Sequence, residues 1–193
     1  MLPRIDETLS SSQLGGEAKM SADKNPRTLT EAEFAKLLDY AEQTRQPVRS
    51  RVIILLSFKA GLSASEIASL RWQNCITIQG GISDHILITD DVARKSFHAG
   101  IRIPLDLDLR LALADLYMIS DDRSPNVPVI LTKRQKRGLL TRAIVEWYRA
   151  VYADLGLEGC SSDTGRRTYV ANKRSSFRPT SQENLEPCAV VPL

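Results

Sequence analysis

The sequence contains few cysteines and histidines, and each shortage excludes a class of protein. Its 193 residues include three cysteines, Cys75, Cys160 and Cys188, whose spacing fits no metal site. An odd cysteine number without a secretory signal is typical of a protein from a reducing cytosol. The two histidines, His85 and His98, are too few and too isolated to indicate zinc. We therefore expect neither a metal nor another cofactor.

Long apolar runs are also missing. The longest, from Val52 to Phe58, is far too short to cross a bilayer, and the first thirty residues have no apolar stretch of signal-peptide length. We expect a cytoplasmic protein without a membrane partner. The net charge is only +3, so any nucleic-acid surface must come from local clusters of Lys and Arg. Apolar content of 42% and charged content of 25% are ordinary for one soluble domain.

Helical signals follow a first segment that has none. Residues 1–28 are rich in Ser, Gly, Asp and Lys without periodicity, which predicts a mobile arm. Thr30 with Glu33 has the capping-box spacing and predicts a helix start. Further helices are predicted from Pro47, buried on most faces, from Ser63 or Ser65 towards Trp72, from Asp106 to Tyr117, and from Leu139 to Leu155.

Three short segments have the composition of β-strands: 75–78, 85–88 and 101–103. The predicted fold is therefore α+β, a mainly helical domain over residues 29–172 with a small three-stranded antiparallel sheet at one edge. From Lys173 the sequence has three prolines and no helical period. Residues 173–193 are predicted to be an unstructured tail.

The stretch SSDTGRRTYVA, residues 161–171, carries the strongest chemical signal. It places Arg166 and Arg167 together at the start of an apolar helix. A guanidinium presents a planar fork of donors that matches two phosphate oxygens, and it stays charged at physiological pH. This pattern predicts a phosphate-binding site.

Three motifs, in this order, resemble the tyrosine recombinase, or phage integrase, family. They are GLSASEIASLRW at 61–72, the Arg102-Ile103-Pro104-Leu105 step, and residues 162–168, which match a His-x-x-Arg signature. The resemblance covers roughly residues 29–172. It implies a catalytic domain for DNA integration and site-specific recombination, with double-stranded DNA as partner and a tyrosyl-phosphate intermediate.

The family's active residues are only partly present. The resemblance places Ser63 where the first catalytic Arg is expected, Asp163 at the His position and Arg166 at the second Arg. The hairpin Lys best matches Lys95, with Arg94 beside it. A nucleophilic Tyr is expected further on, but none follows Tyr169, an aromatic that we interpret as packing.

These differences predict that the chain does not cleave DNA by itself. Losing one donor to the transition-state charge typically costs about two to three orders of magnitude in rate. Asp163 adds a negative charge that repels phosphate and can pair with Arg166. We interpret the chain as a truncated, inactive integrase-like protein. In a further hypothesis another subunit donates the Tyr. That would still leave Ser63 and Asp163 at the positions where the family has Arg and His.

The alternative is a non-catalytic module that binds DNA weakly, near the nucleoid, or docks on an intact recombinase protomer and competes with it. Basic clusters supply most non-specific DNA affinity through the phosphates. Glu66 is interpreted as structural, bonding the backbone or an Arg near a helix start, and Trp72 and Trp147 as core. The candidate DNA-binding residues are Arg102, Lys133, Arg134, Lys136, Arg137 and Arg167.

Overall fold

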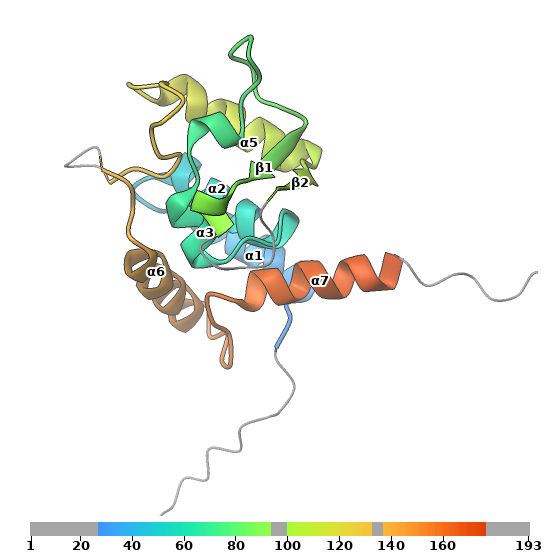
Figure 1. Ribbon diagram of the computed structural model, residues 1–193. Coiled ribbons are helices and arrows are strands. Elements are labelled where there is room, and N and C mark those ends of the chain that lie inside the picture. The colour runs from blue at the N-terminus through green and yellow to red at the C-terminus, as the bar shows by residue number, and fades with distance from the viewer. Residues whose placement is uncertain (1–26, 94–99, 133–136, 177–193) are drawn as a thin grey trace, which may run out of the picture.

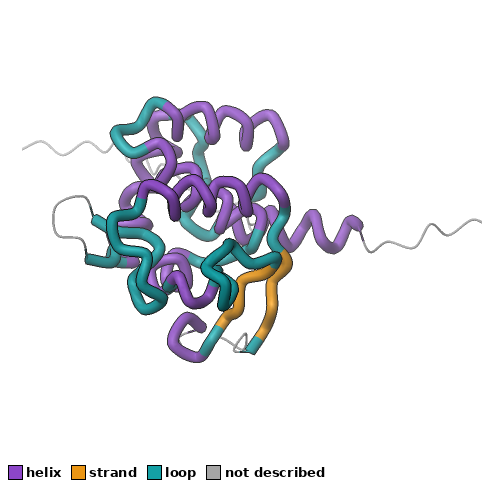
Figure 2. The backbone as a smooth tube through the Cα atoms, turned by 90° about the horizontal axis from the view of Figure 1, so that it is seen from above, coloured by secondary structure: helices purple, strands orange, loops and turns teal. Residues whose placement is uncertain are grey.

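The computed structural model describes residues 27–93, 100–132 and 137–176. Helices form most of it, and a two-stranded sheet lies at one edge (Figures 1 and 2). The predictions for residues 1–26 and 177–193 lie outside the described residues. The elements are α1 (Glu31–Glu42), α2 (Pro47–Lys59), α3 (Ala64–Ser69), the 3₁₀ helix η1 (Trp72–Asn74), β1 (His85–Ile88), α4 (Asp90–Ala93), β2 (Ile101–Pro104), α5 (Leu107–Ile119), α6 (Thr141–Asp154) and α7 (Thr164–Ser176).

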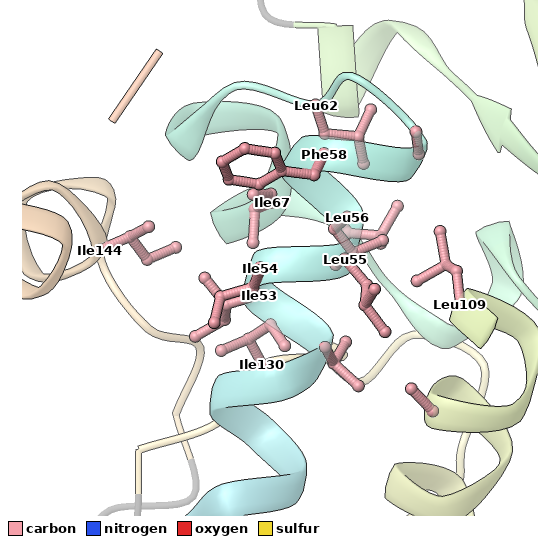
Figure 3. Packing of buried hydrophobic residues seen from close by; sticks show 14 of the residues in the cluster. Ile53, Ile54, Leu55, Leu56, Phe58, Leu62, Ile67, Leu109, Ile130 and Ile144 are labelled. Carbon is pink, nitrogen blue, oxygen red and sulfur yellow. The ribbon is translucent and has the colours of Figure 1, made fainter. Parts of the chain in front are cut away.

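Helix α2 is the centre of the fold. Its residues 52–58 are all buried, and it packs against α1, α3, α5 and α7. In Figure 3 the side chains of α2 reach towards Ile144 of α6 on one side and Leu109 of α5 on the other. A helix that is apolar on every face is stable only inside such a shell, so the prediction of a helix buried on most faces is confirmed.

Helix starts occur where the capping residues predict them. Thr30 and Glu33 form the expected capping box at α1, with the Glu33 amide donating to the Thr30 hydroxyl at 3.3 Å. The Asp106 carboxylate accepts from the Leu109 amide at 3.1 Å at the start of α5. Of the two candidates for α3, Ser63 is the N-cap. These caps satisfy amides that have no partner inside a helix.

The sheet has two strands rather than the predicted three. β1 and β2 pair antiparallel, with Ile86 opposite Ile103. The predicted strand at 75–78 is wrong, because the Ile76 amide donates to the Trp72 carbonyl and Thr77 closes a tight turn onto Gly81. In place of a strand, the segment forms one isolated bridge, Ile76 to Ile82, beside a hydrogen bond from the Ser83 amide to the Cys75 carbonyl. Turn hydrogen bonds engage the backbone amides and carbonyls that a third strand would need for pairing. The β-branched residues of this segment therefore form no strand.

The last helix is longer than predicted. α7 continues to Ser176, so Lys173 and Arg174, the start of the predicted tail, are helical. These two cations lie in its last turn, where they interact favourably with the negative end of the helix dipole. At the opposite end, the Thr168 hydroxyl accepts from the Leu29 amide at 3.0 Å and thereby ties the segment before α1 to α7.

Candidate nucleic-acid interface

Helix α7 carries the predicted phosphate-binding arginines, and two features set its position on α2. Gly165 is buried so tightly that a Cβ there would overlap the side chains of Ser57 and Phe58. The Thr164 hydroxyl accepts from the Ser161 amide at 2.9 Å, which orders the turn before the helix. Only glycine permits this close approach, so the backbone of α7 lies directly against α2. Arg166 follows at once.

Arg166 is held by a buried carboxylate from α3. Its Nη1 lies 2.9 Å from Oε2 of Glu66, whose side chain is 4% exposed against 29% for the arginine. The same oxygen accepts from the backbone amide and the hydroxyl of Ser63, each at 2.8 Å. A buried carboxylate requires such donors, because its charge has lost its hydration. The structural interpretation of Glu66 is confirmed.

Ser63 is used as a helix cap. Its hydroxyl accepts from the Glu66 amide at 3.4 Å and donates to the Glu66 carboxylate. The resemblance places the first catalytic arginine at this position. The short, uncharged side chain of Ser63 is already bonded at the helix start and cannot replace an arginine. At the two positions where the resemblance implies a catalytic arginine, the chain therefore has only Arg166.

Asp163 does not act as expected. It is exposed, its backbone carbonyl accepts from the Arg167 amide at 3.0 Å, and no ion pair joins its carboxylate to Arg166 within the described residues. The expectation that Asp163 occupies Arg166 is wrong, since Glu66 has that role. Asp163 lies just before α7, where its charge is favourable to the helix dipole.

Tyr169 packs against the turn after α2. Gly61 has φ of +68°, and a Cβ there would overlap the Tyr169 ring. The Lys173 ammonium lies 5.7 Å from the centroid of the same ring. This placement supports the interpretation of Tyr169 as a packing aromatic. A cavity of about 210 Å³ lies beside it, lined by Ala60, Gly61, Leu62, Glu66, Ile88, Ile101, Ile103, Arg166, Tyr169 and Val170.

A second cavity opens on the outer side of α7. Its volume is about 370 Å³, and we call its lining the arginine face: Thr28, Arg166, Arg167, Val170, Ala171 and Arg174. Arg167 is oriented by a 2.8 Å hydrogen bond from Nη2 to the Ser161 hydroxyl. Arg166, Val170 and Arg174 follow one another at the i, i+4 spacing that aligns side chains along one side of a helix. Three guanidinium groups therefore surround one concave surface.

The other predicted DNA-binding residues lie elsewhere or outside the described residues. Arg102 is exposed on β2, but Ile101 and Ile103 on either side of it line the smaller cavity, so alternation directs Arg102 to the other side of the strand. Arg137 is exposed beside the Leu131–Gly138 bridge and lines neither cavity. The positions not described are Lys95, Lys133, Arg134 and Lys136.

Sequence reasoning missed Thr28 and Arg174. The signal for Arg174 was present, because Arg166 and Arg174 are eight residues apart, a spacing that returns to the same side of a helix. Because an unstructured tail was predicted from Lys173 onward, Arg174 was not assigned to the helix. Thr28 had no such signal, since its place depends on the Leu29 to Thr168 hydrogen bond between distant segments.

Comparisons with known proteins identify the family and the fold. The model of the family described as "Phage integrase family" matches residues 27–172. The chain belongs to the phage integrase family. The resemblance drawn from the three motifs is thereby confirmed. No curated protein matches the sequence.

Solved structures of integrases share the fold. The Tn1549 transposon integrase in complex with circular intermediate DNA is similar with a TM-score of 0.59 and 14% identity, covering 81% of this chain and 55% of that one. A variant of that integrase in complex with transposon right end DNA has a TM-score of 0.61 and 12% identity, covering 80% and 55%. XerA recombinase has a TM-score of 0.59 and 16% identity, covering 80% and 53%. The chain spans about half the length of these structures.

The described residues lack two kinds of feature, a membrane-spanning helix and a metal-binding cluster. They contain no helix long and apolar enough to cross a membrane. They also contain no group of three or more His, Cys, Asp or Glu side chains placed to hold a metal ion. Another cavity, of about 390 Å³, lies at the N-terminal end of α2, around Gln46 and Arg49, and shares no residue with the arginine face.

Proposed function

We propose that this phage integrase family chain binds the phosphate backbone of duplex DNA through the arginine face and does not cleave it. The observation that carries the proposal is the shared oxygen of Glu66, which accepts from both Ser63 and Arg166. The position that should supply a second guanidinium supplies a helix cap instead. The retained guanidinium remains next to a concave, positively charged surface.

Binding a phosphate requires fewer hydrogen-bond donors than cleaving a phosphodiester. A guanidinium has five N–H donors, and one hydrogen bond to Glu66 leaves further donors for a phosphate oxygen. Cleavage of a phosphodiester adds charge to the equatorial oxygens in the transition state. Donors placed for that charge are worth about 10²- to 10³-fold in rate each, and Ser63 cannot replace one. The ring of Tyr169 packs on Gly61.

The known relatives support DNA as the ligand. The Tn1549 integrase is similar in fold and was solved in complex with DNA. A chain of the same family that binds duplex DNA without cutting it would compete with an intact recombinase for shared sites. Docking on a recombinase protomer is not required for this effect.

The experiment measures affinity for a short duplex by fluorescence anisotropy between about 50 and 250 mM salt. The expected result is weak binding that falls with salt. The double variant Arg167→Ala/Arg174→Ala should reduce the slope of log K against log salt by about two, since each lost phosphate contact removes about one. The matched control is Arg142→Ala, an arginine on α6 that pairs with Glu146 and is absent from the face.

The second arm addresses cleavage. A nicked suicide duplex, which traps a covalent tyrosyl-phosphate, should give no adduct on a denaturing gel. A trapped adduct would contradict the claim of inactivity. Salt-independent affinity, or equal slopes for the double variant and the control, would contradict the claim that the arginine face binds the backbone.

A further inference from the structure

Helix α5 exposes an apolar stripe on the side opposite α2. Leu107 is 69% exposed, Leu111 56% and Met118 67%, and Ala114 completes the spacing of four, three and four residues. In Figure 1 α5 runs along the top of the molecule, on the side away from α6 and α7. Successive i+3 and i+4 steps put these residues on one side of the helix. A helix that is apolar on both sides, with one of them exposed, is typical of an interaction surface.

We infer that this stripe pairs with α5 of a second copy of the chain as a short parallel two-helix interface. The spacing is that of a heptad seam, with Leu107 and Ala114 at d positions and Leu111 and Met118 at a positions. This inference goes beyond DNA binding and does not depend on it.

The flanking charges decide the partner and its direction. Arg110 precedes Leu111 at a g position, and Asp115 follows Ala114 at an e position, so they border the stripe on opposite sides. Both are exposed, and neither has an ion-pair partner within the described part of the chain. In a parallel pair, Arg110 of one copy faces Asp115 of the other, five residues on, and the symmetry repeats the contact.

An antiparallel pair is disfavoured by the same charges. Reversing one helix sets Leu107 level with Met118 and brings equal flanks together, so Asp115 of one copy meets Asp108 of the other while Arg110 meets Tyr117 instead of a carboxylate. Like charges at such positions are destabilising, whereas opposite charges set the orientation of paired helices. The charge pattern is self-complementary only for parallel helices, which gives a two-fold interface.

About three turns of one helix form a small interface, so we expect a dissociation constant of about 10 to 100 µM. The helix is already folded against α2, so association does not have to order it. Sedimentation equilibrium of the full chain up to about 200 µM should show a monomer–dimer equilibrium. A monomer throughout that range would overturn the inference.

Charge variants test the direction. Arg110→Glu should weaken the dimer about tenfold or more, since it replaces two attractive pairs with two repulsive ones. The double variant Arg110→Glu/Asp115→Arg should restore dimerisation, because the pairs are exchanged. In an antiparallel dimer Arg110 faces Tyr117 and no charged residue, so unchanged dimerisation of the Arg110→Glu chain would overturn the parallel pairing.

Cysteine cross-linking gives an independent readout. Met118→Cys should form an intermolecular disulfide under mild oxidation, because equivalent a positions lie together in a parallel seam. A mixture of the Leu107→Cys and Met118→Cys chains should give no preferential mixed product, which an antiparallel seam would favour. Ile78→Cys, at a fully exposed site outside α5, is the control for random collision. Equal cross-linking at positions 78 and 118 would overturn the inference.

Discussion

Glu66 of α3 and Arg166 of α7, one hundred residues apart in the sequence, form an ion pair with Nη1 2.9 Å from Oε2. The pair joins α3 to the helix that carries the arginine face. It fixes the direction of the one retained guanidinium. It also ties that direction to Ser63, which donates to the same oxygen. Stability and the proposed phosphate binding therefore depend on one shared contact.

Replacing Glu66 should separate these two roles. Glu66→Ala removes the acceptor of three donors, and we expect a loss of about 2 to 3 kcal/mol, the range for hydrogen bonds to a charged group. Arg166 is 29% exposed, so water compensates in part. Urea unfolding followed by circular dichroism measures the change. The matched control is Glu146→Ala, whose pair with Arg142 is exposed and should contribute less than about 0.5 kcal/mol.

Ser63→Arg should strengthen DNA binding while it weakens the fold. The substitution removes the N-cap of α3 at a cost of about 1 kcal/mol. It adds a guanidinium beside Glu66, which should raise the salt slope of duplex binding by about one. Anisotropy across salt and urea unfolding measure the two effects.

The control for this substitution is Ser65→Arg, which adds the same charge two residues away and keeps the cap. Neither Ser63→Arg nor the double variant Ser63→Arg/Asp163→His should cleave a suicide duplex. A covalent adduct from either would show that Tyr169 or another residue acts as nucleophile. An unchanged salt slope would show that position 63 does not reach the backbone.

The sequence predicts most of the helices because their signals are local. Thr30 with Glu33 and Ser63 with Glu66 act over three residues, and Gly61 ends α2 through its own backbone angle. The strand predicted at 75–78 failed because β-rich composition does not specify a partner. Turn hydrogen bonds to Trp72 and Gly81 are formed instead.

The candidate site is predictable only in part. The paired arginines at 166 and 167 and the Ser at position 63 follow from the motifs. The partner of Arg166 does not, because nothing local selects Glu66 over Asp163, which is only three residues away in the sequence. The choice depends on the close approach of α7 to α2 at Gly165, a property of the packed fold.

Gly165→Ala tests that close approach. The added methyl would overlap Ser57 and Phe58, and α7 would have to move away from α2. Overpacking of this kind typically costs about 1 to 3 kcal/mol, whereas alanine in a helix is otherwise favourable. The expected result is a lower urea midpoint together with weaker DNA binding, because the arginine face moves with the helix.

Gly81→Ala is the matched control for this change. Its added Cβ meets only the Thr77 hydroxyl, at 3.8 Å, and Gly81 is not among the glycines with positive φ. We expect its free energy of unfolding to stay within about 0.5 kcal/mol of that of the parent chain. If Gly165→Ala were equally neutral, α7 would not be packed as tightly as its position on α2 requires.

The two described cysteines should differ in reactivity towards a thiol reagent. Burial raises the pKa of the Cys75 thiol to about 12, and the side chain is inaccessible. Burial also raises the pKa of Cys160, which is only half-buried, while Arg27 lowers it in part. The thiolate is the reactive form, so a raised pKa and a closed site both slow the reaction.

In a Cys188→Ser chain at pH 8, we expect Cys160 to react slowly and Cys75 only after unfolding. The rate at Cys160 should rise steadily with pH, because its folded pKa lies above that of an unfolded thiol. Cys75 should react in step with urea-induced unfolding, measured by mass spectrometry of the labelled peptides. Fast native labelling of Cys75 would mean that the region under η1 opens without global unfolding, since Cys75 directly follows that short helix and is fully buried.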